Sequence, residues 1–214
     1  MEAKIAGLEL SRVLNNALAF VPARAKTPFI RLSVGWGYVS CMGTDTYAVG
    51  SDSAVAATSG STSVTLGRSD AVDLEKAARA DKKGYGTLTL ERGGVLFLPS
   101  QASVEGSGVA QEFGDHSELW DACEALLVRL EDRTVSLPVT VAFQPDILAR
   151  FAKVKAVGEN VADFYFSDES SQVLVKFGES FRGAIMPITR DKAPEGSLAP
   201  RNPTSRTTVR SLAR

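Results

Sequence analysis

The 214-residue sequence contains few of the side chains that perform catalysis or bind metals. It has one histidine, His116, and two cysteines, Cys41 and Cys123, which lie far apart and form no C-x-x-C pair. A Ser-His-Asp triad needs a histidine base beside a positioned serine, and no G-x-S-x-G motif is present. One histidine and two separated cysteines also cannot make up a typical zinc site. The composition therefore argues against a hydrolase and against a zinc protein.

Nucleotide-binding and membrane-spanning motifs are missing as well. No G-x-x-x-x-G-K-[ST] phosphate loop occurs, because Gly178-Glu-Ser-Phe-Arg-Gly lacks the lysine and the following helix. The scattered acids Glu112, Asp115 and Glu118 are more typical of helix capping and solvation than of a cation site. No apolar run is long enough to cross a bilayer or to form the core of a signal peptide. We therefore predict a cytoplasmic protein, of a cell or of a virus-infected cell, that is not an enzyme and needs no cofactor or metal.

The overall charge excludes a bulk nucleic-acid binder. There are 24 lysines and arginines against 25 acids, a net charge of −1, with 44% apolar and 23% charged residues. Any contact with DNA must therefore come from local clusters of cations. The segment from Thr189 to Arg214 has six basic residues and two acids, a net charge of +4, so the rest of the chain carries −5. This segment is poor in large apolar residues, and we predict a disordered basic tail over 189–214.

Hydrophobic periodicity predicts an α+β protein with antiparallel sheets and helices packed on one face. Helices are indicated over residues 8–21, with Ser11 as N-cap, and from Ser69, Ser117 and Pro145 onward. Strands are indicated where apolar residues alternate or form short runs between glycines and other turn residues. These predicted strands lie within residues 29–56, 63–66, 86–90, 95–98, 135–143, 161–166, 172–177 and 181–188.

The order of these elements divides the chain into two unequal parts. We predict a first domain over 1–98, a linker over 99–116 and a second domain over 117–188. The order strand, capped helix, hairpin in residues 66–98 returns in residues 141–177, which is a faint internal repeat. The second domain is predicted to be shortened, because its first helix leads almost directly into the strand at 135.

Several short segments, taken in order, resemble one known family. Gly43-Thr-Asp-Thr-Tyr-Ala-Val resembles the Thr-Asp segment that follows the first helix and strands of a domain in bacterial-type DNA sliding clamps, in particular in a compact phage-type member. Glu112-Phe-Gly-Asp resembles the acidic and aromatic segment at a domain junction. Phe143-Gln-Pro-Asp-Ile-Leu-Ala-Arg-Phe and the hairpin that begins at Ala162 resemble the last helix and closing hairpin. Gly183-Ala-Ile-Met-Pro-Ile is similar to the C-terminal Met-Pro signature.

The resemblance implies a polymerase processivity factor that encircles double-stranded DNA without reading its sequence. Two domains in each chain imply a homo-oligomer, with a trimer favoured over a dimer, because three chains give six domains. Helices are expected to line the hole with lysines and arginines that contact phosphates. Lys76, Arg79 and Lys83 recur along one face of the second predicted helix. The predicted DNA-binding residues are Arg12, Arg24, Lys26, Lys76, Arg79, Lys82, Lys83, Arg150 and Lys153.

The resemblance also implies an apolar groove that docks peptides of DNA polymerase and of the clamp loader. Its walls are expected at the Thr-Asp segment and at the Met-Pro end of the chain. Methionine and proline on a rigid edge suit short peptide motifs. The predicted partner-binding residues are Thr44, Thr46, Tyr47, Ala48, Met186, Pro187 and Ile188.

Two other hypotheses are compatible with the sequence. The shortened second domain and its acidic first helix favour a clamp-fold adaptor or inhibitor that binds replication proteins without forming a ring. Its acids are Glu118, Asp121, Glu124, Glu131 and Asp132. An unrelated α+β structural protein, for example of a virion, is the third reading.

Overall fold

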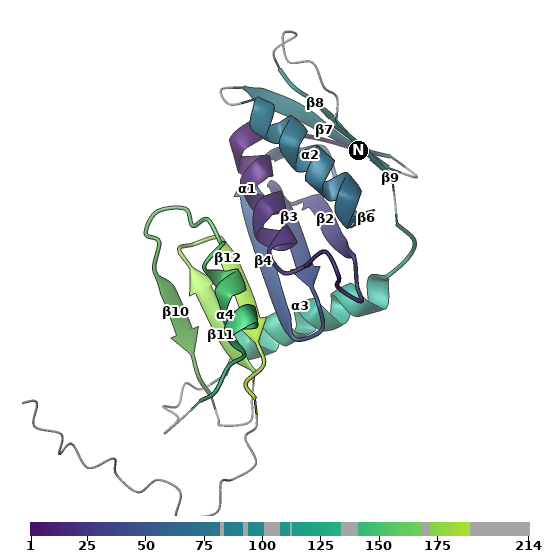
Figure 1. The fold of residues 1–214 in the computed structure, drawn as a ribbon. Helices are drawn as coiled ribbons and strands as arrows, with labels where there is room; N and C mark the ends of the chain where they lie inside the picture. The colour runs from purple at the N-terminus through teal and green to yellow at the C-terminus, as the bar shows by residue number, and fades with distance from the viewer. Residues whose placement is uncertain are drawn as a thin grey trace, which may run out of the picture.

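The computed structural model describes residues 1–81, 84–91, 94–100, 108–111, 113–133, 141–167 and 172–188 (Figure 1). These residues form four helices and two antiparallel sheets, which confirms the predicted α+β class. The predicted tail over 189–214 lies outside the described residues, and so do Lys82, Lys83 and Glu112.

The four helices are separated along the chain by groups of strands, except that α4 follows α3 in the order of elements. The helices are α1 (Gly7–Leu18), α2 (Arg68–Ala80), α3 (Ser117–Glu131) and α4 (Pro145–Phe151). One sheet has the strand order β5-β1-β7-β8-β9 and the other the order β10-β11-β12-β4-β3-β2-β6. The first sheet contains β1 (Glu2–Ala6), β5 (Ala57–Thr58), β7 (Tyr85–Glu91), β8 (Gly94–Leu98) and β9 (Gly108–Gln111). The second contains β2 (Phe29–Gly35), β3 (Tyr38–Thr44), β4 (Ala48–Val55), β6 (Thr62–Gly67), β10 (Ala162–Tyr165), β11 (Val173–Phe177) and β12 (Phe181–Ile185).

The larger sheet joins the two halves of the chain. β12, from the end of the described chain, pairs with β4 in the register Gly183↔Gly50 and Ile185↔Ala48. The predicted domains 1–98 and 117–188 therefore share one continuous sheet. The predicted linker over 99–116 contains the strand β9, which pairs with β8. This pairing is a long-range contact, which local sequence patterns do not encode.

The two faces of the larger sheet are covered by different helices, because successive strand residues point to opposite faces. Cys41 packs in the core beneath α1 and α2, whereas its neighbour Met42 packs with α3. Similarly, Ile185 packs with α4 and Ala184 packs with α3. Helices α1, α2 and α4 thus share one face, called here the helical face, and α3 crosses both halves on the opposite, outer face (Figure 1).

Helix α1 lies so close to β3 and β4 that two positions beneath it need glycine. Gly43 and Gly50 are opposite each other in the β3–β4 ladder. A Cβ at Gly43 would overlap the carbonyl of Ala17, and one at Gly50 would overlap the ring of Phe20. The close approach buries the apolar side of α1, including Leu14 and Ala17, without exposed surface.

Three local predictions differ from the structure. Ser11 is not an N-cap, because β1 leads directly into α1 at Gly7 and the Ser11 hydroxyl donates to Glu75 Oε1 at 2.7 Å. Ser69 lies inside α2, whose N-cap is Gly67. Of the predicted strand over 135–143, residues 135–140 lie outside the described part, and 141–143 form no strand.

Candidate functional site

A concave, basic surface lies on the helical face between α1, α2 and α4. It is a hollow of about 630 Å³ whose lining contains five cations and two acids. The concentration of positive charge in a concave surface raises the local potential for phosphates. The cations are Arg68, Lys76, Arg79, Arg150 and Lys153, and the acids are Glu75 and Asp146.

Three of these cations are exposed and only weakly engaged. Lys76 Nζ lies 2.9 Å from Asp73 Oδ1, and Arg79 Nε lies 3.7 Å from Glu75 Oε1. The Lys76–Asp73 pair is exposed on both sides and contributes little, and Arg79 is too far from the buried Glu75 for a hydrogen bond, so a phosphate can bind either cation. No ion pair of Lys153 is found within the described residues, and its side chain is exposed. Lys76, Arg79 and Lys153 thus come from two helices to one surface, as their prediction as DNA contacts requires.

Two other predicted DNA contacts are engaged inside the protein. The Arg150 side chain is largely buried, and its Nη1 lies 2.5 Å from Asp45 Oδ2, an ion pair without hydrogen-bond geometry. Arg12 is only 9% exposed and pairs with Asp52 and Glu9. Because its guanidinium has no free face, Arg12 is withdrawn from the predicted DNA set. Its burial follows from α1 turning Arg12 toward the buried carboxylate on β4.

The remaining predictions for DNA contacts have different outcomes. Arg24 and Lys26 are exposed on the segment after α1, but they do not line the hollow. Lys82 and Lys83 lie outside the described residues. Arg68 lines the hollow although sequence reasoning missed it, and its Nε donates to the carbonyl of Val21 at 2.8 Å.

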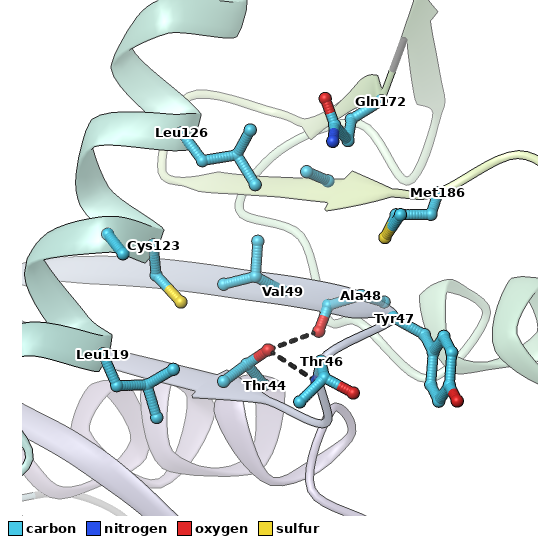
Figure 2. A pocket seen from close by; sticks show the side chains of 12 residues that line it. Thr44, Thr46, Tyr47, Ala48, Val49, Leu119, Cys123, Leu126, Gln172 and Met186 are labelled. Carbon is cyan, nitrogen blue, oxygen red and sulfur yellow. Dashed lines mark hydrogen bonds between the residues drawn. The ribbon is translucent and has the colours of Figure 1, made fainter. Parts of the chain in front are cut away.

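An apolar groove lies on the outer face of the larger sheet, beside the β3–β4 turn. The groove has a volume of about 270 Å³. Helix α3 bounds it on one side and Met186 on the other (Figure 2). Five of its lining residues belong to the predicted partner-binding set: Thr44, Thr46, Tyr47, Ala48 and Met186. The others are Val49, Leu119, Ala122, Cys123, Leu126, Gln172 and Ala184.

Hydrogen bonds hold the β3–β4 turn at the groove. The Thr44 hydroxyl donates to the carbonyl of Ala48 at 2.9 Å and accepts from the Thr46 N–H at 3.2 Å (Figure 2). Asp45 Oδ1 accepts from the N–H groups of Tyr47 and Ala48, both at 3.1 Å. Thr46 has φ +81°, which is unusual for a β-branched residue. Such a conformation persists only where the surroundings fix it, so this wall of the groove is rigid.

The second wall is α3, which sequence reasoning did not assign to the groove. Trp120 anchors the helix, since its Nε1 donates to Thr65 Oγ1 at 3.0 Å. Near its end, Glu131 lies 2.9 Å from Lys176 Nζ and 3.1 Å from Arg182 Nη1. Burial raises the pKa of Glu131, but these two cations outweigh it, so the pKa is lowered from its usual value. Burial also raises the pKa of the Cys123 thiol, which faces the groove as a neutral apolar group.

The last two predicted partner residues do not line the groove. The N–H of Met186 donates to the carbonyl of Tyr47 at 3.2 Å, which fixes Met186 at the rim. The N–H of Ile188 then donates to the carbonyl of Ala142 at 2.8 Å. Pro187 and Ile188 follow the rim residue, and neither is among the lining residues.

The structure also bears on metals and membranes. Within the described ranges, no group of three His, Cys, Asp or Glu side chains could hold a metal ion. No helix among the described residues is long and apolar enough to span a membrane.

Comparison with known proteins identifies the fold. No protein-family model matches the chain, and no curated protein does. Its structure is similar to the DNA polymerase III subunit beta of Pseudomonas aeruginosa, with 12% identity and a TM-score of 0.62 over 89% of this chain and 67% of that one. For the sliding clamp of Bacillus subtilis the values are 13%, 0.61, 89% and 65%. For the Helicobacter pylori beta clamp bound to a DNA ligase peptide they are 10%, 0.65, 94% and 69%. The chain thus has the sliding-clamp fold and spans about two thirds of the length of these proteins.

Proposed function

We propose that this chain, which has the sliding-clamp fold, is a non-catalytic processivity factor that encircles duplex DNA and docks replication proteins. The observation that supports this most strongly is that the two faces of one sheet carry different surfaces. The helical face presents exposed cations in a concave surface, and the outer face presents an apolar groove. Such a protein works where DNA is replicated, in the cytoplasm of a bacterium or of a phage-infected cell.

The helical face suits sequence-independent contact with a duplex. Lys76, Arg79 and Lys153 have long side chains that reach phosphates but are not held in a geometry that reads bases. Contacts of this kind are weak and screened by salt, which lets a ring slide. The acids of α3 lie on the opposite face, where Glu124 and Glu131 pair with Arg182. Helix α3 itself carries four acids and one arginine, so it disfavours duplex binding at its own surface.

The groove suits a short peptide with apolar side chains. Leu119, Leu126 and Met186 offer a partly exposed apolar lining, and the Thr44 hydroxyl and Gln172 offer polar contacts at its edges. Peptides bind such preformed grooves through a few apolar anchors. The Helicobacter pylori clamp, which has a DNA ligase peptide bound, supports a peptide of this class as the ligand here. DNA polymerase and clamp-loader peptides are the expected natural partners.

The proposal includes a homo-oligomeric ring, with three chains favoured. Two clamp-like parts in each chain make six in a trimer. One observation favours the alternative of an adaptor or inhibitor that does not form a ring. Within the described residues, the second half contributes only the strands β10, β11 and β12, so it offers fewer edges to a neighbouring chain.

Filling the groove is expected to abolish peptide binding. Ala122 is exposed on the α3 wall, and arginine is well tolerated in helices, so Ala122→Arg should fold normally and place a long side chain in the groove. The measurement is the binding of a fluorescent peptide with the sequence found in the Helicobacter pylori ligase complex. We expect the affinity to fall at least about tenfold, which corresponds to about 1.4 kcal/mol.

The matched control is Ala125→Arg. Ala125 is also exposed on α3 but does not line the groove, so this variant should bind the peptide as the unchanged protein does. Equal binding by both variants, or no binding by the unchanged protein, would contradict the groove assignment.

A further inference from the structure

The tip of the β2–β3 hairpin carries an exposed tryptophan that folding does not require. Gly35 and Tyr38 pair across a two-residue turn made of Trp36 and Gly37. Both turn residues have positive φ, +56° for Trp36 and +82° for Gly37. Turns of this kind favour Asn-Gly or Asp-Gly, because a bulky side chain is strained in the left-handed region. Trp36 is nevertheless 91% exposed, so burial does not offset this strain.

A small polar hollow adjoins the tryptophan on the outer face of the sheet. It has a volume of about 230 Å³ and is bounded by Trp36 and the half-exposed Tyr38. Ser33 and Ser40 lie opposite each other in the β2–β3 ladder and form its floor. Hydroxyls of Ser61, Thr62 and Ser63 on β6 and the preceding turn add further donors. Arg31 is the only charged residue among those that line the hollow.

Arg31 is placed to receive an anion. Its Nη2 donates to the Ser63 hydroxyl at 3.2 Å, and its Nη1 lies 3.5 Å from Asp121 Oδ1. The Asp121 side chain is 74% exposed, so this long ion pair is a weak, solvated one. A phosphate can therefore replace Asp121 as the partner of the guanidinium, with neighbouring hydroxyls as additional donors.

We propose that Trp36, Tyr38 and Arg31 form a binding site for single-stranded nucleic acid, outside the duplex-binding surface proposed above. A base stacks on Trp36 or Tyr38, and Arg31 with the surrounding hydroxyls binds the adjacent phosphate. An aromatic platform beside a cation is the usual arrangement for single strands, because every base has a face to stack. The hollow is smaller than ordinary ligand pockets and takes one base or phosphate group, not a duplex.

The site lies on the opposite side of the sheet from the helical face. Arg31 and Ser33 point outward, while Leu32 between them is buried in the core beneath α1 and α2. A duplex held by α2 and α4 and a single strand held by the hairpin tip therefore contact separate surfaces of one chain. The single strand that adjoins a duplex during replication has both groups that this site is proposed to bind, an unpaired base and an adjacent phosphate.

The tryptophans of the chain provide a direct test. Trp36 is exposed, whereas Trp120 is 1% exposed and serves as an internal reference. The full-length protein is titrated with an oligothymidylate of about a dozen nucleotides while tryptophan emission is recorded. We expect the emission of Trp36 to be quenched, and we expect no quenching in Trp36→Phe, which leaves Trp120 as the sole tryptophan.

A second variant separates binding from folding. Trp36→Asn suits the turn better than tryptophan does, so it should leave the fold intact or stabilise it. Its affinity for a labelled oligothymidylate, measured by anisotropy, should fall about tenfold, since one stacked base is lost. Arg31→Gln should lower the salt dependence of binding.

Two outcomes would overturn the proposal. One is the absence of quenching by the oligonucleotide, which would leave the hairpin tip as a surface for a protein partner. The other is unchanged affinity in Trp36→Asn. The double variant Arg79→Glu, Lys153→Glu should keep the quenching, so failure of the duplex-binding proposal and failure of this one give different results.

Discussion

The double variant Arg79→Glu, Lys153→Glu is expected to lose retention on duplex DNA. The two residues are exposed on α2 and α4 and line the same basic hollow, so reversal replaces two phosphate contacts by repulsion. Each phosphate contact contributes about 0.9 to the slope of log affinity against log salt, so the slope should fall by about two. We expect the affinity for a duplex without sequence preference to fall by about a hundredfold at low salt, measured by anisotropy across a salt series.

The matched control reverses one lysine and one arginine on other surfaces. Lys4 is exposed on β1 and Arg129 is exposed on α3, and neither lines the hollow. The variant Lys4→Glu, Arg129→Glu has the same net charge as the test variant. If both variants lose DNA binding equally, net charge rather than the helical face determines retention, and the assignment of α2 and α4 to DNA is wrong.

Among the variants proposed for this protein, Asp52→Ala is expected to lower the free energy of unfolding most. Asp52 is 1% exposed on β4, pairs with Arg12, and accepts from Asn16 Nδ2 at 2.7 Å. Removing the carboxylate leaves the largely buried guanidinium of Arg12 with Glu9 as its one charged partner among the residues that the structure describes. Breaking a buried pair in this way costs about 3–5 kcal/mol. The measurement is the free energy of unfolding from a denaturant titration.

The same network should link the two halves of the chain. Asn16 Nδ2 donates to the carbonyl of Lys155 at 3.0 Å, and Arg12 Nη1 donates to the Ser180 hydroxyl at 3.1 Å. Loss of Asp52 should therefore loosen the contact of α1 with the second half. Asp163→Ala, at an exposed position on β10, is the control and should change stability by less than about 0.5 kcal/mol. Equal stability of the two variants would contradict a structural role for the network.

Most residues of the predicted peptide-binding set line the apolar groove. The Thr-Asp and Met-Pro segments placed Thr44, Tyr47 and Met186 in one groove, and the structure brings them together because β12 pairs with β4. That α3 forms one wall of the groove could not be predicted from the sequence. The amphipathic pattern of α3 predicts an apolar side, but it does not say which face of a sheet that side covers.

The basic surface was predictable only in part. Spacing along α2 put Lys76 and Arg79 on one helix side, and both line the hollow. Arg12 was predicted only from its place at the first helix, and its partner Asp52, which turns the side chain into the protein, lies on a strand distant in sequence. The strand β1 was also missed, since only Ile5 and two alanines mark its five residues as apolar.

The central claim is that this chain closes into a ring around duplex DNA. The most direct measurement is the solution mass by light scattering across a concentration series, with and without a short duplex. For such a ring we expect a defined assembly of three chains, 3 × 22.8 = 68.4 kDa, to which the duplex adds its own mass when it is bound. A mass of 22.8 kDa at every concentration, with and without DNA, would contradict the ring and favour the adaptor.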